Sequence, residues 1–121
     1  MKVIIDLIED IRTAINNNTA FSLTAMQLTE SADGEFIPAG ESKVCHYELD
    51  DEQKKLYFVL GKKQAVETGD LLEALNALSN EKMMYEVTVA YGNPDQRIVK
   101  PLIGFGEAFE DKKYLLFISD R

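Results

Sequence analysis

Residues 44–60 have the sequence VCHYELDDEQKKLYFVL, which contains the clearest hairpin signal in the chain. A polar run at residues 50–54 separates two strand-like segments, residues 44–49 and 56–60. Two such segments joined by a short polar turn predict a β-hairpin. Because residues 56–60 are apolar on both faces, we expect this segment at the centre of a sheet.

The only cysteine and the only histidine, Cys45 and His46, are neighbours in the first of these strands. Side chains alternate across a strand, so the two are expected on opposite faces. This places Cys45 toward the core with Tyr47, and His46 on the outer face beside Glu48. A cysteine–histidine catalytic dyad within one chain is therefore not expected. One histidine with carboxylates alone is a poor zinc site, so we predict no metal and no cofactor.

Outward from the hairpin, two helices are expected. Residues 2–16 show an apolar stripe at helical spacing. The stripe consists of Ile4, Leu7, Ile8, Ile11, Ala14 and Ile15. A second helix is expected to start at residues 68–70 and to end at Asn80, with Asp70 as its N-cap and Glu73 three residues later.

Strand and turn signals fill the rest of the chain. Strands are expected at residues 21–29, 85–91, 98–109 and 114–119, turns at 32–35 and 92–95, and a loop at 38–40. The predicted order is αβββαβββ. We therefore expect a single α+β domain, residues 1–121, with a mainly antiparallel sheet of five to six strands. Both helices are expected to pack on one face of that sheet.

Charge and cysteine content narrow the possible partners. The chain of 121 residues has 13 basic and 21 acidic residues, a net charge of −8. This sign opposes binding to nucleic acid or to an anionic membrane, and favours a basic protein partner. A lone cysteine cannot form an internal disulfide, which is typical of a reducing compartment. Asp6, Glu9 and Asp10 interrupt the N-terminal apolar run, so no signal peptide is expected and we predict a cytoplasmic protein.

Residues 103–109 have a two-sided pattern. Small residues fall on one face, Gly104, Gly106 and Ala108, and larger ones on the other, Ile103, Phe105, Glu107 and Phe109. Three interpretations follow. The larger face packs on the core with Glu107 near an edge, or it forms a subunit interface. Alternatively, Glu107 lies in a pocket as a general base, with Tyr91 or Tyr114 nearby.

Size, acidity and the opening order of elements are similar to those of the small acidic dimeric chaperones of type III secretion. Those chaperones usually finish with a helix, whereas this chain finishes with the strand-like run at residues 114–118. No motif accompanies the resemblance, and no family is assigned from it. It implies a homodimer that acts through protein contacts.

Three hypotheses for function follow. The first is a non-enzymatic interaction module, chaperone-like or adaptor-like and homodimeric, with interface candidates Ile103, Phe105, Phe109 and His46. The second is an acidic inhibitor or immunity-type protein that caps a basic surface of an enzyme. The third is a small enzyme or ligand-binding domain that uses Glu107.

Overall fold

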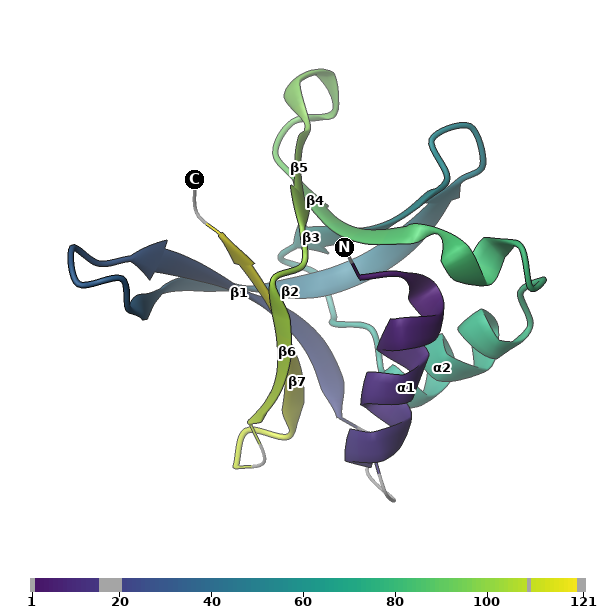
Figure 1. Ribbon diagram of the computed structural model, residues 1–121, viewed down its shortest axis with the longest axis horizontal. Coiled ribbons are helices and arrows are strands. Elements are labelled where there is room, and N and C mark those ends of the chain that lie inside the picture. Colours follow the sequence, from purple (N-terminus) through teal and green to yellow (C-terminus); the bar gives the residue numbers. More distant parts are fainter. Residues whose placement is uncertain (1, 16–20, 109, 120–121) are drawn as a thin grey trace.

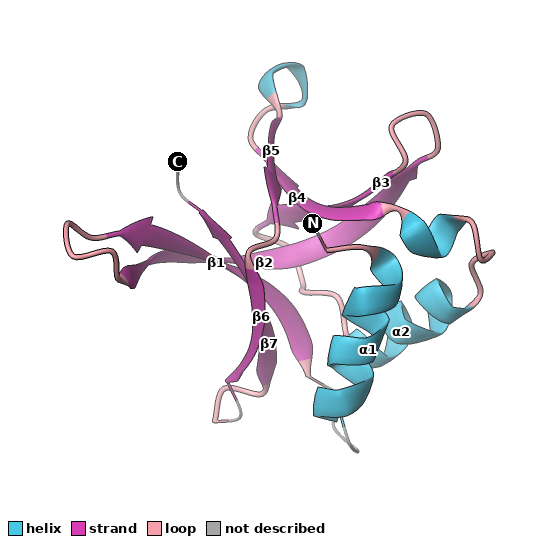
Figure 2. Cartoon of the chain, viewed as in Figure 1, coloured by secondary structure: helices cyan, strands magenta, loops and turns pink. Residues whose placement is uncertain are grey.

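The computed structural model describes residues 2–15, 21–108 and 110–119. Its elements alternate along the chain in the order helix, three strands, helix, four strands (Figures 1 and 2). The bounds are α1 (Ile4–Ile15), β1 (Ser22–Glu30), β2 (Phe36–Asp50), β3 (Lys55–Gly61), α2 (Thr68–Asn76), β4 (Glu86–Tyr91), β5 (Ile98–Pro101), β6 (Gly104–Ala108) and β7 (Lys113–Ser119). Short 3₁₀ turns, η1 (Lys82–Met84) and η2 (Pro94–Gln96), flank β4.

The two helices form as expected, with two corrections to α2. The helix ends at Asn76, so the predicted end at Asn80 is wrong. The stripe of α1 is buried at Ile4, Leu7, Ile8 and Ile11. Both helices lie together on one side of the sheet (Figure 1). The prediction that Asp70 caps α2 is wrong, because the N-cap is Glu67 and no side chain bonds to the helix end there. The start of α2 is held instead by Thr68, whose Oγ1 donates a hydrogen bond to the buried carbonyl of Phe21 at 2.6 Å.

The sheet is mixed, with four antiparallel and two parallel pairs of neighbouring strands, so the prediction of a mainly antiparallel sheet of five to six strands is only roughly matched. Within the described residues it has seven strands in the order β5-β4-β3-β2-β1-β7-β6. The pairs β1–β7 and β3–β4 are parallel, and the other neighbours are antiparallel. The α+β class is confirmed, and β3 lies inside the sheet as predicted. The alternation of residues 85–91 predicts a strand with one buried face, but β4 is buried on both faces, including Thr88 and Ala90.

The two edge strands of the sheet are consecutive in the chain. Residues 102–103 connect β5, paired with β4, to β6, paired with β7. A two-residue link between opposite edges requires the sheet to curl, and the buried side chain of Leu102 fills the inside of the bend. The prediction of one strand over residues 98–109 is therefore wrong. We call the face that carries the buried side chains of Phe58, Val89 and Leu116 the concave face, and its opposite the convex face.

A β-bulge at Cys45 changes the expected faces of the first hairpin. Val44 pairs with Leu60 and His46 pairs with Val59, so Cys45 is the extra residue. Val44 is fully buried, whereas Cys45 is half-buried with its sulfur over Gly61. The prediction that Cys45 belongs to the core is therefore wrong. Cys45 lies on the convex face, on the same side as His46.

The hairpin of β1 and β2 is longer than expected. The loop predicted at residues 38–40 is wrong, since β2 continues through it and pairs with β1. A register shift leaves Ala39 as an extra residue between the pairs Gln27–Gly40 and Leu28–Pro38. The end of this hairpin projects away from the helices (Figure 1). In the part of the chain that the structure describes, no helix has the length and apolar character needed to cross a membrane.

Candidate functional site

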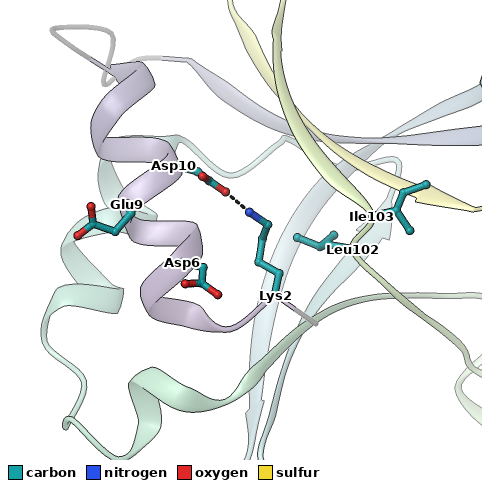
Figure 3. A pocket seen from close by; sticks show the side chains of 6 residues that line it. All are labelled: Lys2, Asp6, Glu9, Asp10, Leu102 and Ile103. Atoms are coloured by element: carbon teal, nitrogen blue, oxygen red, sulfur yellow. Dashed lines mark hydrogen bonds and ion pairs between the residues drawn. The ribbon is translucent and has the colours of Figure 1, made fainter.

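An open cleft separates α1 from the link between β5 and β6. It has a volume of about 470 Å³ and is lined by Lys2, Asp6, Glu9, Asp10, Leu102 and Ile103. Leu102 is buried, whereas Ile103 is 47% exposed. Figure 3 shows Lys2 between the helix and the link, with its ammonium group aimed at Asp10. The cleft therefore combines an apolar wall with a charged one.

The charged wall follows from helical spacing. Asp6 and Asp10, four residues apart, lie along one side of α1, and Lys2, four residues before Asp6, precedes the helix. Lys2 forms an ion pair with Asp10. Asp6 accepts a hydrogen bond from the backbone N–H of Val3 at 3.3 Å, as an acidic side chain in the first turn of a helix commonly does. With Glu9, three carboxylates and one ammonium give the lining a net charge of −2.

The interface candidates from the sequence are separated by the fold. Ile103 lines the cleft, and its backbone N–H donates to the carbonyl of Phe117 at 2.8 Å. Phe105 is half-buried against the core and stacks on Tyr114, with ring centroids 5.6 Å apart. Phe109 lies outside the described residues. His46 is on the convex face and lines neither the cleft nor a second pocket of about 210 Å³ beside Gln27 and Tyr91.

Glu107 lies on the concave face at an edge, which agrees with the interpretation of core packing. It pairs across the strands with Tyr114 and is exposed on β6. Burial and the nearby charge of Glu107 raise the pKa of the Tyr114 phenol. Tyr91 lines the same pocket as Gln27 of β1. Tyr114, the partner of Glu107, instead pairs with Leu23, near the other end of β1. Glu107 and Tyr91 are therefore not brought together.

The small-residue face of β6 is covered by an aromatic ring. Gly104 and Gly106 lie on the convex face beneath Phe117 of β7. A Cβ atom at Gly106 would lie 2.8 Å from Cε2 of Phe117. The close approach indicated by the two glycines is thus to a neighbouring side chain, and it leaves Phe105 to face the core.

His46 belongs to a small charged network on the convex face. Its Nε2 is 3.2 Å from Oε1 of Glu48, and Arg97 donates to the other oxygen of Glu48 at 3.0 Å. These hydrogen bonds, that of Arg97 first, lower the pKa of Glu48. The guanidinium of Arg97 also lies 5.8 Å from the ring centroid of Tyr57. The expected surface histidine beside a carboxylate is confirmed.

Sequence reasoning noted the acidic residues of α1 but did not connect them to a site. The repeat of Lys2, Asp6 and Asp10 was the available signal. No sequence signal indicated the opposite wall of the cleft, because the bend at residues 102–103 depends on which strands pair.

No group of three or more histidine, cysteine, aspartate or glutamate side chains suited to a metal ion occurs among residues 2–15, 21–108 and 110–119. Comparisons of the chain with protein-family models, with curated proteins and with solved structures found no match.

Proposed function

We propose that the protein is a small, non-enzymatic, cytoplasmic binding module whose cleft holds a basic, partly apolar segment of a partner protein. The observation that carries the proposal is the occupant of the cleft: the ammonium of Lys2 lies there against Asp10. The chain's own lysine thus indicates the kind of group that the cleft accepts. Exposed Ile103 on the other wall supplies apolar contact for the stem of an arginine or lysine.

The electrostatics of the whole chain support this choice of partner. A net charge of −8 steers a basic partner toward the protein and speeds its association. The capping of a basic enzyme surface, as by an inhibitor, uses the same contacts. An adaptor and an inhibitor therefore differ in their partner and not in the site.

A labelled peptide of alternating lysine and leucine residues tests the cleft directly through fluorescence anisotropy. Asp10→Lys reverses one wall of the cleft, whereas Glu73→Lys makes the same charge change on an exposed position of α2. We expect Asp10→Lys to weaken binding about tenfold, or ~1.4 kcal/mol, and Glu73→Lys to have a much smaller effect. Equal losses in both variants would show that net charge alone attracts the peptide, and would refute the cleft.

Lys2→Met provides the opposite test. Removal of the resident ammonium frees Asp10, so the peptide should bind more tightly than to the wild type. Lys62→Met changes the net charge equally at a distance from the cleft and is the matched control. A variant that merely damaged the fold would weaken binding instead.

A further inference from the structure

The cleft beside α1 continues directly into a free edge of the sheet. Leu102 and Ile103 line the cleft, and β6 (Gly104–Ala108) follows them at once in the chain. β6 is the last strand of the sheet, and among the described strands it pairs with β7 alone. In Figure 1, β6 continues from this link across from α1. A segment held in the cleft therefore lies next to the start of this edge.

The backbone of β6 has unused hydrogen-bonding groups along its outer edge. The N–H and C=O groups of a strand point alternately to its two edges, so only some of them face β7. Apart from the ladder with β7 and a turn contact between Ala108 and Asp111, residues 104–108 form no backbone hydrogen bond within the described part of the chain. Gly104 and Gly106 are half-buried, and because glycine has no side chain, their exposed atoms are backbone. The outer edge is therefore unpaired and reachable.

The two edge strands of the sheet differ in their protection against pairing. Lysine and proline are common guards of exposed edges, and β5 contains both, Lys100 and Pro101. β6 has the sequence GFGEA and contains neither. Its one charged residue, Glu107, is exposed. A carboxylate at this position repels the same strand of a second copy and attracts a basic segment.

We propose that the basic segment of the partner binds as an extended strand, which pairs with the outer edge of β6 and adds one strand to the sheet. The inference rests on the proposed function, because it specifies how the occupant of the same cleft is bound. From Ile103 to Glu107 the edge extends over about 13 Å, the rise of four residues in a strand. A segment that starts beside Asp10 and follows β6 therefore meets a carboxylate at each end.

The two faces of the added strand meet different surroundings. Glu107 and α1 lie on the concave side, so every second side chain of the segment faces carboxylates. The other side chains face the convex side, where the half-buried ring of Phe117 lies over Gly104 and Gly106. The site therefore selects a segment in which basic and apolar residues alternate.

Two N-methylated forms of the lysine–leucine peptide separate strand pairing from contact through side chains alone. Methyl groups on a central lysine and the leucine beside it block N–H groups on both edges of the peptide and leave every side chain in place. Methyl groups on the two terminal residues are the matched control. In fluorescence anisotropy with the full chain, we expect the central pair to weaken binding at least about tenfold and the terminal pair to have little effect.

The results distinguish this inference from the proposed function. If both methylated peptides bind as well as the parent peptide, strand pairing is refuted and the cleft remains the binding site. If the parent peptide does not bind, the proposed function and this inference both fail.

A charge reversal on β6 tests how far the segment extends. Glu107→Lys should weaken binding of the parent peptide about fivefold, whereas Glu73→Lys, the same charge change on α2, should have a much smaller effect. Equal effects of the two variants would show that the peptide does not reach β6, and would refute the inference.

Amide hydrogen exchange measured by NMR locates the added strand. Saturating peptide should slow the exchange of the outward-facing amides of residues 104–108 at least about tenfold and leave those of β5 unchanged. Protection of β5 without β6 would place the strand at the other edge and overturn the proposal. So would a dimer that protects β6 in the absence of peptide, because a second copy would then fill the edge.

Discussion

At the scale of single residues, Tyr114 has the most unusual environment. Its side chain is fully buried between Phe21 and Phe105, and its hydroxyl is the one buried side-chain polar atom among the described residues that has no hydrogen-bond partner. An unsatisfied buried polar group costs about 1–3 kcal/mol. The ring therefore stabilises the core while its hydroxyl opposes that effect.

Tyr114→Phe should consequently raise the free energy of unfolding by about 1 kcal/mol in urea denaturation. Tyr85→Phe is the control and should lower the free energy of unfolding, because the Tyr85 hydroxyl donates a hydrogen bond to Asp51 at 2.7 Å. If Tyr114→Phe proves destabilising, the hydroxyl has a partner after all, such as a bound water.

The raised pKa of Tyr85 also predicts that stability depends on pH. The hydrogen bond to Asp51 raises its pKa from the ordinary 10.0 to about 12. The folded state then holds the phenolic proton more tightly than the unfolded state. This contribution is complete below pH 10 and is lost as the pH rises through about 12. Phenolate absorbance should show Tyr85 titrating late, and Asp51→Asn should move it earlier.

The pair Cys45–His46 shows the limit of prediction at this scale. Strict alternation predicts opposite faces, and the exposed His46 beside Glu48 was predicted correctly. The bulge inserts one residue, so the burial expected for Cys45 falls on Val44 instead. A bulge depends on how the partner strand pairs, which a single strand does not encode.

At the scale of elements, the ring of Phe117 on β7 packs over Gly104 and Gly106 on β6. Gly106→Ala would place a Cβ 2.8 Å from Phe117, whereas Gly104→Ala would meet that ring at 3.4 Å. We expect Gly106→Ala to lower the free energy of unfolding by ~1–2 kcal/mol and Gly104→Ala to have little effect. In a Phe117→Leu background the difference between the two should shrink; its persistence would place the strain in the backbone.

The elements recognised from sequence were those with a strong local pattern. The apolar stripe of α1 and the apolar run of β3 are each enough to identify the element, because burial follows directly from the spacing of the apolar residues. The start of α2 was misjudged because Thr68 bonds to Phe21, 47 residues away. Local capping rules favour Asp70 and contain no information about such a partner.

At the scale of the whole molecule, strand pairing was the part that sequence did not determine. Apolar runs identify strands but not their neighbours, so the parallel pairs β1–β7 and β3–β4 were missed. The bend at residues 102–103 was missed for the same reason, since it exists only because β5 and β6 pair with different strands. The acidic cleft depends on that bend and could not be assembled beforehand.

The tip of the β1–β2 hairpin, residues 30–36, should be dispensable for folding of the single chain. No residue from 30 to 36 belongs to the buried core. Replacement of residues 30–36 by Asn-Gly, a preferred two-residue hairpin turn, should change the free energy of unfolding by less than ~1 kcal/mol in dilute solution. Loss of cooperative unfolding in the shortened chain would contradict this.

The parallel pairing of β1 with β7 has a consequence for synthesis. Lys113 follows its partner Ser22 by 91 residues, so β1 leaves the ribosome long before the strand that covers its second edge. At about 5–20 residues per second, this delay is on the order of 5–20 s. During that interval the apolar side chains of Leu23 and Ala25 lack the cover of β7. The nascent chain is therefore open to capture by ribosome-associated chaperones, and to aggregation where these are scarce.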